Sequence, residues 1–303
     1  MIEPAREGEI RAVAAFRERN DLPALADVHV HFAPPNVEAK VFAYFEAAGP
    51  LIGREWPIAY RVSHEERLAL LAAFGVRRFS SMIYPHKPGM AAWLNEWAAE
   101  FSARTPPCAR TATFFPEPSA AGYVRRALTA GARVFKCHVQ VGGFDPRDPL
   151  LDPVWGQLAD AQVPTIIHAG SGPVAGAHTG PGPVAEVLAR HPGLPLVIAH
   201  LGMPEYGAFL DLAAAHERVW LDTTMAFTDF AQAQAPFPAA LRPRLLELAD
   251  QIVLGSDLPT IPYPYVHQLE ALERLELGPE WLAKVCWHNG IRLLGPPPAE
   301  AGS

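Results

Sequence analysis

The chain of 303 residues has few cysteines, and those it has do not suit a disulfide framework. Only three occur, Cys108, Cys137 and Cys286, an odd number without any CxxC pair. No run approaches the roughly 18 apolar residues of a membrane span, and the charged start lacks the apolar centre of a signal peptide. These absences predict a soluble, cytoplasmic protein without disulfides.

Basic charge and phosphate-binding glycine motifs are also missing. The formal net charge is −7 at pH 7, and no cluster of basic residues offsets it, which argues against a nucleic-acid partner. No GxGxxG or GxxxxGK[ST] loop follows an apolar run, so a nucleotide-binding fold has no support. We therefore expect a small-molecule substrate rather than a nucleic acid or a membrane. A homodimer is a candidate assembly.

The sequence does contain a regular alternation of apolar runs and helical patterns. Eight β-rich runs occur, at 24–32, 76–84, 109–115, 132–141, 163–170, 194–202, 218–224 and 251–257. Segments rich in Ala, Leu and Glu lie between them, and a helix at about 279–293 closes the chain. This pattern predicts one α/β domain over residues 1–303. Eight βα units favour a (β/α)8 barrel of the TIM type over an open doubly wound sheet.

One connection between a strand and its helix is unusually long. Residues 33–63 follow the first strand and contain five aromatic side chains together with several glycines and prolines. Loops of this length are uncommon in compact domains and often serve as lids or binding loops. We expect an extended loop at the barrel mouth that either sets substrate specificity or contacts a second copy of the chain.

The first strand carries polar side chains inside the apolar run ALADVHVHF. Because successive side chains of a strand alternate between its faces, Asp27, His29 and His31 share one face. Burying such groups without partners costs about 1–3 kcal/mol each. Two histidines with this spacing can converge on one metal ion. On this fragment alone, two hydrogen-bonded core histidines are the alternative.

Further polar side chains fall at the ends of the later strands. Barrel enzymes have their active sites at the C-terminal ends of the strands, and seven residues of this chain are expected there. They are His29, His31, Lys136, His138, His168, His200 and Asp257. A random scatter of the twelve histidines would not be expected to fall along one rim, so the pattern predicts a single active site.

The same landmarks resemble those of a known family. The segments DVHVHF, IIHAG, VIAHLG, LGSDLP and NGIRLLG occur in this order between Asp27 and Gly295. They are similar to the successive motifs of the amidohydrolase superfamily, specifically its amidohydrolase-related branch. That branch includes decarboxylases resembling aminocarboxymuconate-semialdehyde decarboxylase. Each motif alone is weak, but five in order at strand ends make the resemblance specific.

The resemblance implies a metal centre and its ligands. One divalent ion, with zinc as the expected metal, would be bound by His29, His31, His168 and Asp257. His200 would stand beside it as the acid/base or carbonyl-polarising residue. Asp27, roughly 13 Å from His31 along the strand, would be too deep to bind the ion and would form hydrogen bonds inside the barrel.

Such a site supports two related reactions. Zinc lowers the pKa of a bound water from about 15.7 to near 7, Asp257 could take its proton, and His200 could stabilise the substrate oxygen. The expected function is hydrolysis of a C–N or C–O bond in a small molecule. The alternative is a decarboxylase or hydratase of the same fold acting on an aromatic or unsaturated carboxylate. Arg54, Arg61 and Lys87 lie on loops suited to bind such a carboxylate.

Lys136 bears on the number of ions. It is one of four lysines and lies in the apolar run RVFKCHV, where an ammonium is costly to bury. By resemblance to binuclear members of the superfamily, a carbamylated Lys136 would bridge two ions, with His200 binding the second. As an unmodified amine it would bind substrate, together with His138 and Tyr84, and this is the role we expect. A third alternative pairs it with an acid such as Glu117.

Overall fold

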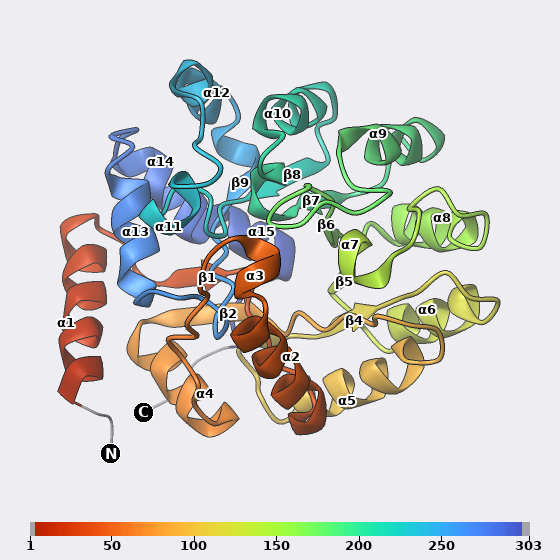
Figure 1. The fold of residues 1–303 in the computed structure, drawn as a ribbon, viewed down its shortest axis with the longest axis horizontal. Helices are drawn as coiled ribbons and strands as arrows, with labels where there is room; N and C mark the ends of the chain where they lie inside the picture. The colour runs from red at the N-terminus through yellow and green to blue at the C-terminus, as the bar shows by residue number, and fades with distance from the viewer. Residues whose placement is uncertain (1–3, 299–303) are drawn as a thin grey trace.

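Short parallel strands form the inner layer of the computed structural model, which describes residues 4–298 (Figure 1). They are β1 (Leu25–Asp27), β2 (Val76–Ser80), β3 (Cys108–Ala109), β4 (Thr111–Thr113), β5 (Val134–His138), β6 (Thr165–His168), β7 (Leu196–Ile198), β8 (Val219–Asp222) and β9 (Ile252–Val253). Each strand is hydrogen-bonded to the next along the chain, in the orders β1 to β3 and β4 to β9. Every strand run expected from the sequence therefore contains at least one strand.

Two connections join these sheets into a ring. β3 and β4 belong to one chain segment and are separated by Arg110 alone. On the other side, the residues that follow β1 pair with those that follow β9. The N–H of Val28 donates to the carbonyl of Leu254 at 2.9 Å, and the N–H of His31 donates to that of Leu258 at 2.7 Å. With β3 and β4 counted as one strand, this is the predicted (β/α)8 barrel.

The strands are buried on both faces, as is typical of parallel sheets covered by helices. Neighbouring residues alternate between two apolar clusters. Ile166 and Val197 pack inside the barrel, whereas Ile167 and Ile198 pack between the sheet and the surrounding helices. This alternation follows from the two-residue repeat of a strand.

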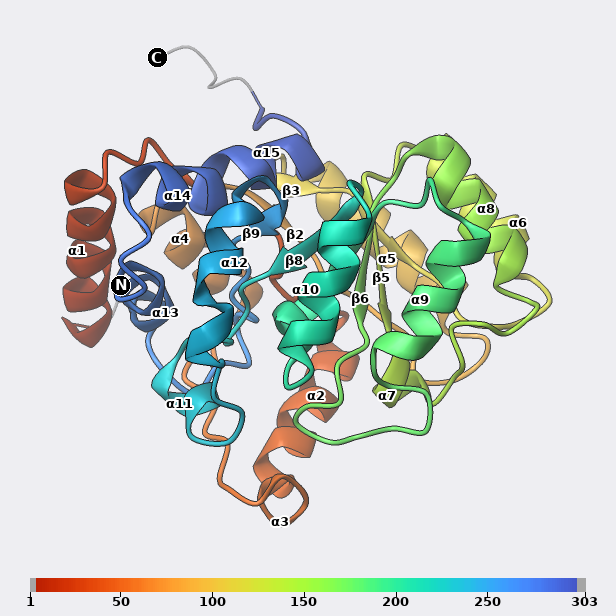
Figure 2. The ribbon, with the colours of Figure 1, turned by 90° about the horizontal axis from the view of Figure 1, so that it is seen from above.

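Helices surround the barrel on its outside (Figures 1 and 2). They are α1 (Pro4–Arg19), α4 (His64–Ala73), α5 (Ala91–Ala103), α6 (Ala120–Thr129), α8 (Asp152–Ala161), α9 (Pro181–Arg190), α10 (Tyr206–Ala215), α12 (Arg242–Glu247), α13 (Tyr265–Glu273), α14 (Pro279–Ala283) and α15 (Asn289–Leu294). The expected closing helix is present as α14, a π-helical turn at Lys284–His288, and α15. Among residues 4–298, no helix has both the length and the apolar character that a membrane span requires.

The long connection after β1 is helical rather than an irregular loop. It contains α2 (Pro35–Ala47) and α3 (Gly49–Ile52), which lie across the front of the barrel in Figure 1 and project from it in Figure 2. α2 starts at a proline, which suits the first helical position. Val37, Val41 and Phe45 recur every four residues, so they share one face of the helix.

Three further short helices lie near the strand ends. They are α7 (Val139–Gly142), which follows β5, a 3-10 turn at Ala199–Gly202, which follows β7, and α11 (Asp229–Gln232). The three cysteines are buried and free, as expected. The barrel therefore presents its C-terminal rim, the insertion and these short helices on one side of the molecule.

Candidate active site

A cavity of about 710 Å³ lies at the C-terminal ends of the strands. All seven residues singled out at the strand ends line it: His29, His31, Lys136, His138, His168, His200 and Asp257. Side chains of α2 and of the loops after β2 and β6 form much of its wall, and residues of α3, α7 and the segments after β7, β8 and β9 complete it. The structure thus brings the predicted site residues together in one place.

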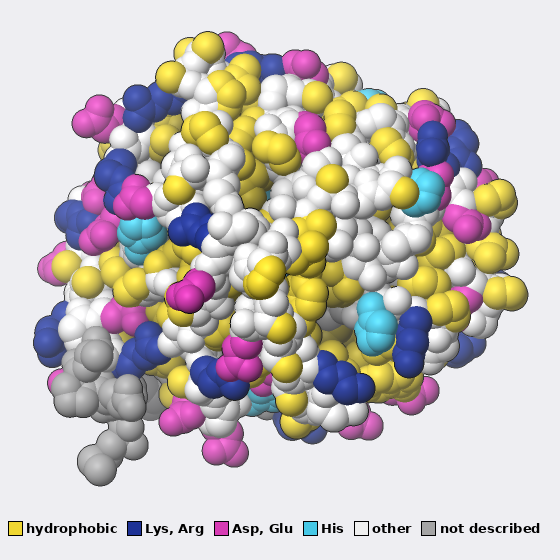
Figure 3. Space-filling model, viewed as in Figure 1, with side chains coloured by type: hydrophobic (Ala, Val, Ile, Leu, Met, Phe, Trp, Pro, Cys, Tyr) yellow, Lys and Arg dark blue, Asp and Glu magenta, His cyan; other side chains and the backbone are white. Residues whose placement is uncertain are grey.

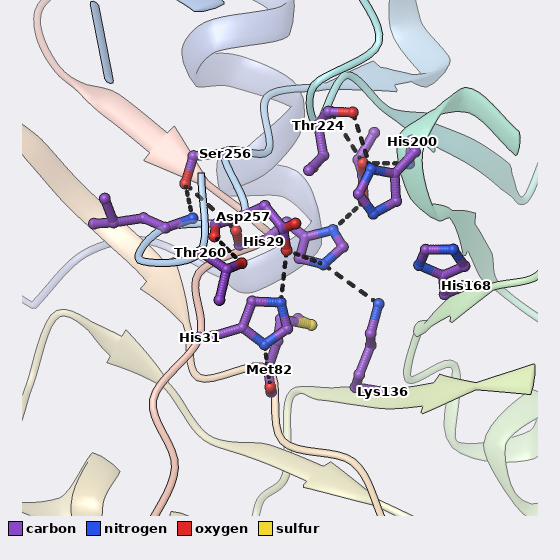
Figure 4. A network of polar contacts seen from close by, with 12 residues as sticks. His29, His31, Met82, Lys136, His168, His200, Thr224, Ser256, Asp257 and Thr260 are labelled. Atoms are coloured by element: carbon purple, nitrogen blue, oxygen red, sulfur yellow. Dashed lines mark hydrogen bonds and ion pairs between the residues drawn. The ribbon is translucent and has the colours of Figure 1, made fainter. Parts of the chain in front are cut away.

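His29, His31 and Asp257 form the tightest group on the cavity floor (Figure 4). One ligand atom from each lies within 4.8 Å of the others. His31 Nε2 is 2.8 Å from Asp257 Oδ1, and His29 Nε2 is 3.6 Å from the same oxygen. Two imidazole nitrogens and a carboxylate oxygen are ligands that divalent metals accept. The donor set of this group therefore fits a metal ion.

The other ring nitrogen of each histidine in this group has its own acceptor. His29 Nδ1 is 2.8 Å from Asp222 Oδ2, and His31 Nδ1 is 2.6 Å from the backbone oxygen of Met82. An Nδ1–H that donates to these oxygens leaves Nε2 unprotonated, as a metal ligand must be. Such partners also fix the orientation of the ring and raise its basicity as a ligand.

Asp222 is a site residue that the sequence analysis missed. It ends β8 and is fully buried. Its Oδ1 accepts hydrogen bonds from the backbone N–H of His200 at 2.8 Å and of Thr224 at 3.1 Å. Burial alone would raise the pKa of Asp222, but His29, His200 and Thr224 lower it overall, so the group is a carboxylate. An acid at the end of the run RVWLDTT was the available signal.

Lys136 on β5 points to the same floor. Its Nζ is 3.4 Å from His29 Nε2. Burial lowers the pKa of Lys136, and the carboxylates of Asp222 and Asp257 oppose this shift. Burial, with the charge of Lys136, lowers the pKa of His29 to about 4, so this imidazole is neutral at pH 7. Glu117, the alternative partner of the lysine, instead accepts a hydrogen bond from the N–H of Gly89 at 2.7 Å.

His168 and His200 stand beside this group, and each has a backbone acceptor. His168 Nε2 is 3.0 Å from the oxygen of Gly172, and His200 Nδ1 is 3.1 Å from that of Thr224. Their ring centroids are 4.7 Å apart, and that of His200 is 5.2 Å from that of His29. Burial lowers the pKa of His168 to about 3 and that of His200 to about 4. Both rings are therefore neutral at pH 7.

His138 and Tyr84 form part of the wall above the floor. The ring of His138 stacks on that of His168 at a centroid distance of 3.9 Å, and its Nδ1 accepts a hydrogen bond from Val141. The ring of Tyr84 lies 5.1 Å from that of His138 and 5.9 Å from that of His31. Burial raises the pKa of Tyr84, so its hydroxyl keeps its proton at pH 7.

Two of the three basic residues considered as carboxylate ligands do not line the cavity. Arg54 donates to the backbone oxygen of Phe230 at 2.6 Å, and its guanidinium lies 3.5 Å from the centre of that ring. Arg61 pairs with Glu46. Their charges therefore hold the insertion in place, and only Lys87 lines the cavity.

Asp27 joins the two chain segments that supply the metal-fitting group. Its carboxylate accepts hydrogen bonds from the N–H of His29 and of Ser256, both at 3.1 Å, and from the hydroxyl of Tyr265 at 3.0 Å. Asp27 is not a member of the group. This is the hydrogen-bonding role expected of a residue so deep in the strand.

Gly255 allows these segments to approach each other. A Cβ atom at this position would lie 2.2 Å from Thr224 Oγ1 and 2.8 Å from the Cβ of His29. Any other residue would therefore push the segment after β9 away from the first strand. This explains the glycine in the sequence LGSDLP.

Asp257 and His200 have backbone torsions in the left-handed region. Their φ angles are 71° and 56°, and this region costs a residue with a Cβ about 1–2 kcal/mol. For Asp257 the conformation is held by a hydrogen bond from its N–H to the carbonyl of His29 at 2.8 Å. Such strained residues are concentrated at functional sites.

Comparison with protein families identifies the family of the chain. Residues 26–295 match a family model described as Amidohydrolase. The chain belongs to the amidohydrolase family. The amidohydrolases are metal-dependent enzymes, which agrees with the donor set on the cavity floor. A comparison with curated protein sequences finds no match to this amidohydrolase.

Solved structures share the fold at low sequence identity. A TIM-barrel protein from Bordetella bronchiseptica is 19% identical, with a TM-score of 0.71 over 89% of this chain and 98% of its own. The 5-carboxyvanillate decarboxylase LigW2 from Novosphingobium aromaticivorans, with bound manganese, is 13% identical, with a TM-score of 0.60 over 89% and 97%. A probable 2-pyrone-4,6-dicarboxylic acid hydrolase from Acinetobacter baumannii is 12% identical, with a TM-score of 0.59 over 90% and 99%. At these identities the likeness shows the fold of this amidohydrolase alone.

Proposed function

We propose that this amidohydrolase hydrolyses a C–N or C–O bond of a small molecule with the help of one divalent metal ion. The observation that carries the proposal is the convergence of His29, His31 and Asp257 on the floor of a cavity of about 710 Å³. Zinc is the metal we propose, because imidazole and carboxylate ligands with an open position are typical of catalytic zinc sites. The manganese in the decarboxylase structure makes manganese the second choice.

His168 is the fourth ligand that we propose. Its Nε2 donates to the carbonyl of Gly172, so the neutral ring carries its lone pair on Nδ1. The lowered pKa of His168 keeps that nitrogen free of a proton at pH 7.

The remaining groups have distinct parts in the reaction. A bound divalent ion makes a water molecule acidic and polarises a substrate oxygen. Asp257 accepts the proton of the attacking water and passes it to the leaving group. Burial alone would raise the pKa of Asp257, but the contact with His31 lowers it overall, so Asp257 is ionised at pH 7.

The hydrogen bond that His200 makes through Nδ1 indicates which tautomer the ring adopts and therefore which role it can have. Because Nδ1 donates to the carbonyl of Thr224, the neutral ring presents an unprotonated Nε2, which accepts a proton rather than donating one. We therefore propose that His200 is an acid/base residue and does not polarise the substrate carbonyl in its resting state. Lys136, Tyr84 and His138 bind the substrate.

Decarboxylation is the second candidate function, and Lys136 favours it. An unmodified amine on the cavity floor can neutralise a substrate carboxylate, and the apolar wall suits an aromatic or unsaturated body. The decarboxylase named above has a similar barrel. Loss of carbon dioxide from such a substrate would need no attacking water.

One experiment separates these functions. Protein purified without chelators is analysed for metal and incubated with amides, esters, lactones and aromatic carboxylates in water enriched in oxygen-18. We expect about one equivalent of metal and a product that contains the label, without release of carbon dioxide. Carbon dioxide release would support the decarboxylase instead. Two equivalents of metal would indicate a carbamylated Lys136, and native protein that binds no metal would refute both functions.

A further inference from the structure

Lysines are concentrated at the cavity of a protein that is acidic overall. The chain has four lysines and a net charge of −7. Three of the four, Lys40, Lys87 and Lys136, line the cavity, whereas none of its described lining residues is an arginine. Lys136 is buried on the floor, and Lys40 and Lys87 are exposed at the mouth. Lysine side chains therefore stand at both ends of the cavity.

The two lysines at the mouth make no ion pair within the described part of the chain, whereas the fourth lysine does. Lys284, on the opposite side of the barrel, pairs with Asp250 at 3.1 Å. The two acids that line the cavity are also engaged: Glu38 pairs with Arg67 at 2.7 Å, and Asp257 contacts His31. No acid of the cavity is thus left to neutralise Lys40 and Lys87.

The wall between floor and mouth is largely apolar. Its side chains include Val41, Phe42, Phe45, Met90, Leu94 and Val174. Three apolar residues at the rim remain open to solvent, with exposed fractions of 46% for Tyr44, 37% for Trp93 and 38% for Val141. Figure 3 shows hydrophobic side chains gathered in the middle of this face, over and beside α2 and α3. A substrate that filled only the floor would leave this surface in water.

We infer that the substrate is an elongated molecule with an apolar body and an anionic group at the end far from the reacting bond, and that Lys40 and Lys87 bind this anion. What we infer about the reacting end of the substrate rests on the proposed function. What we infer about its far end rests only on the residues at the mouth. A volume of about 710 Å³ lies within the roughly 300–1,000 Å³ of pockets that enclose such molecules. Because Lys40 belongs to α2 and Lys87 to the loop after β2, the anion also links the insertion to the barrel.

Two dyes with one apolar body test this inference without turnover. 8-Anilino-1-naphthalenesulfonate carries a sulfonate, and N-phenyl-1-naphthylamine has the same rings without the charge. Their dissociation constants are measured by fluorescence for the full chain and for the K40Q/K87Q, K40R/K87R and K284Q/R125Q variants. The last pair is the control and removes two positive charges away from the mouth, the exposed Arg125 and the half-buried, ion-paired Lys284.

We expect the anionic dye to bind about fivefold more weakly to K40Q/K87Q, the size of effect typical of two exposed ion pairs. K40R/K87R and K284Q/R125Q should bind it as the unmodified protein does, and the neutral dye should bind all four proteins alike. Equal losses for both dyes, an equal loss in K284Q/R125Q, or no loss would overturn the inference. A protein that hydrolyses nothing but shows the expected dye preference would refute the proposed function and leave this inference standing.

Discussion

The floor and the mouth of the cavity are built in opposite ways. On the floor, the polar side chains come from strand ends, are buried or, in the case of His31, half-buried, and have partners such as Asp222 and Met82. At the mouth, Lys40 and Lys87 are exposed and unpaired within the described chain, and they come from a helical insertion and a loop. The barrel itself therefore positions the polar groups of the floor, whereas the added segments position the lysines of the mouth.

The difference also separates two kinds of energetic effect. A buried polar group that loses its partner costs about 1–3 kcal/mol, whereas an exposed group costs little. Substitutions on the floor should therefore change metal binding, turnover and stability together. Substitutions at the mouth should change substrate affinity alone.

The largest effect is expected for Asp257→Asn. The variant loses both a metal-fitting oxygen and the proton acceptor, and proton-transfer groups contribute about 10²–10⁴-fold to rates. We expect turnover to fall about 10⁴-fold together with metal content, as measured by initial rates and elemental analysis. Asp160→Asn, an exposed carboxylate on α8, is the control. If the variant kept the ion and roughly a tenth of the activity, Asp257 would be neither a metal ligand nor the proton acceptor.

His200→Asn should have the next largest effect, which should be on the reaction rate and not on the metal content. Since His200 is proposed to move a proton, we expect a loss of about 10²–10³-fold in kcat with the ion retained. His168→Ala should instead lose the ion. If metal and activity disappeared together in His200→Asn, His200 would be a ligand and the site would hold a second ion.

Asp222→Asn tests whether the hydrogen-bond partner of His29 contributes to metal binding. Loss of the carboxylate that holds His29 Nδ1 should weaken metal affinity about 10–100-fold, the range found for such partners. Titration of chelator-treated protein with zinc would measure this. Asp27→Asn, also buried but bonded to backbone N–H groups, should lower stability and change metal affinity less. If Asp27→Asn weakened metal affinity more than Asp222→Asn, Asp222 would not support the metal site.

The stability of metal-free protein should depend on pH because of the floor histidines. In the folded state the pKa of His168 is about 3 and those of His29 and His200 about 4, below an unfolded value near 6.5. The unfolded state therefore binds more protons between pH 6.5 and 4, and stability falls as pH falls through this window. One such histidine contributes about 1.4 kcal/mol per pH unit.

Urea unfolding at several pH values would measure this dependence. His168→Asn should reduce the slope between pH 6.5 and 4, because it removes one of the three groups. His288→Asn, at an exposed position far from the cavity, should leave the slope unchanged. A slope that does not change in either variant would contradict the buried, neutral state of the floor histidines.

The smallest effect is expected at the mouth. Tyr44→Ala removes an exposed ring from the rim and should raise KM about threefold, the loss expected from a partly solvated apolar contact, while kcat and metal content stay constant. Leu246→Ala, also an exposed apolar residue but on α12, should leave KM unchanged. A change in kcat or metal content in Tyr44→Ala would show that mouth and floor are not independent.

The positions of the floor residues could be predicted from the sequence because they follow from the strands. An apolar run fixes where a strand ends, and parallel strands of a barrel end at one rim, so His29, His168 and Asp257 had to lie near each other. Orientation could not be predicted in this way. His168 donates to Gly172 and His29 donates to Asp222, and these contacts depend on loops and on strands far away in the sequence.

The insertion was placed correctly, but its conformation and its contacts were not predicted. The spacing of Val37, Val41 and Phe45 is a helical signal, yet it is short and lies among glycines and prolines. Arg54 and Arg61 have the right charge for a carboxylate, but tertiary contacts with Phe230 and Glu46 occupy them. Charge and loop position alone do not show which side chains remain available to a ligand.

The left-handed backbone of Asp257 and His200 has a consequence for directed evolution. Glycine adopts positive φ without the steric penalty of a Cβ atom, so glycine at these two positions would relieve about 1–2 kcal/mol each. It would also remove the carboxylate and the imidazole to which we assign the proton transfers of the proposed reaction. Because loss of either side chain would also leave a buried partner unsatisfied, at a cost of about 1–3 kcal/mol, a library selected only for heat resistance should gain little from glycine at positions 257 and 200.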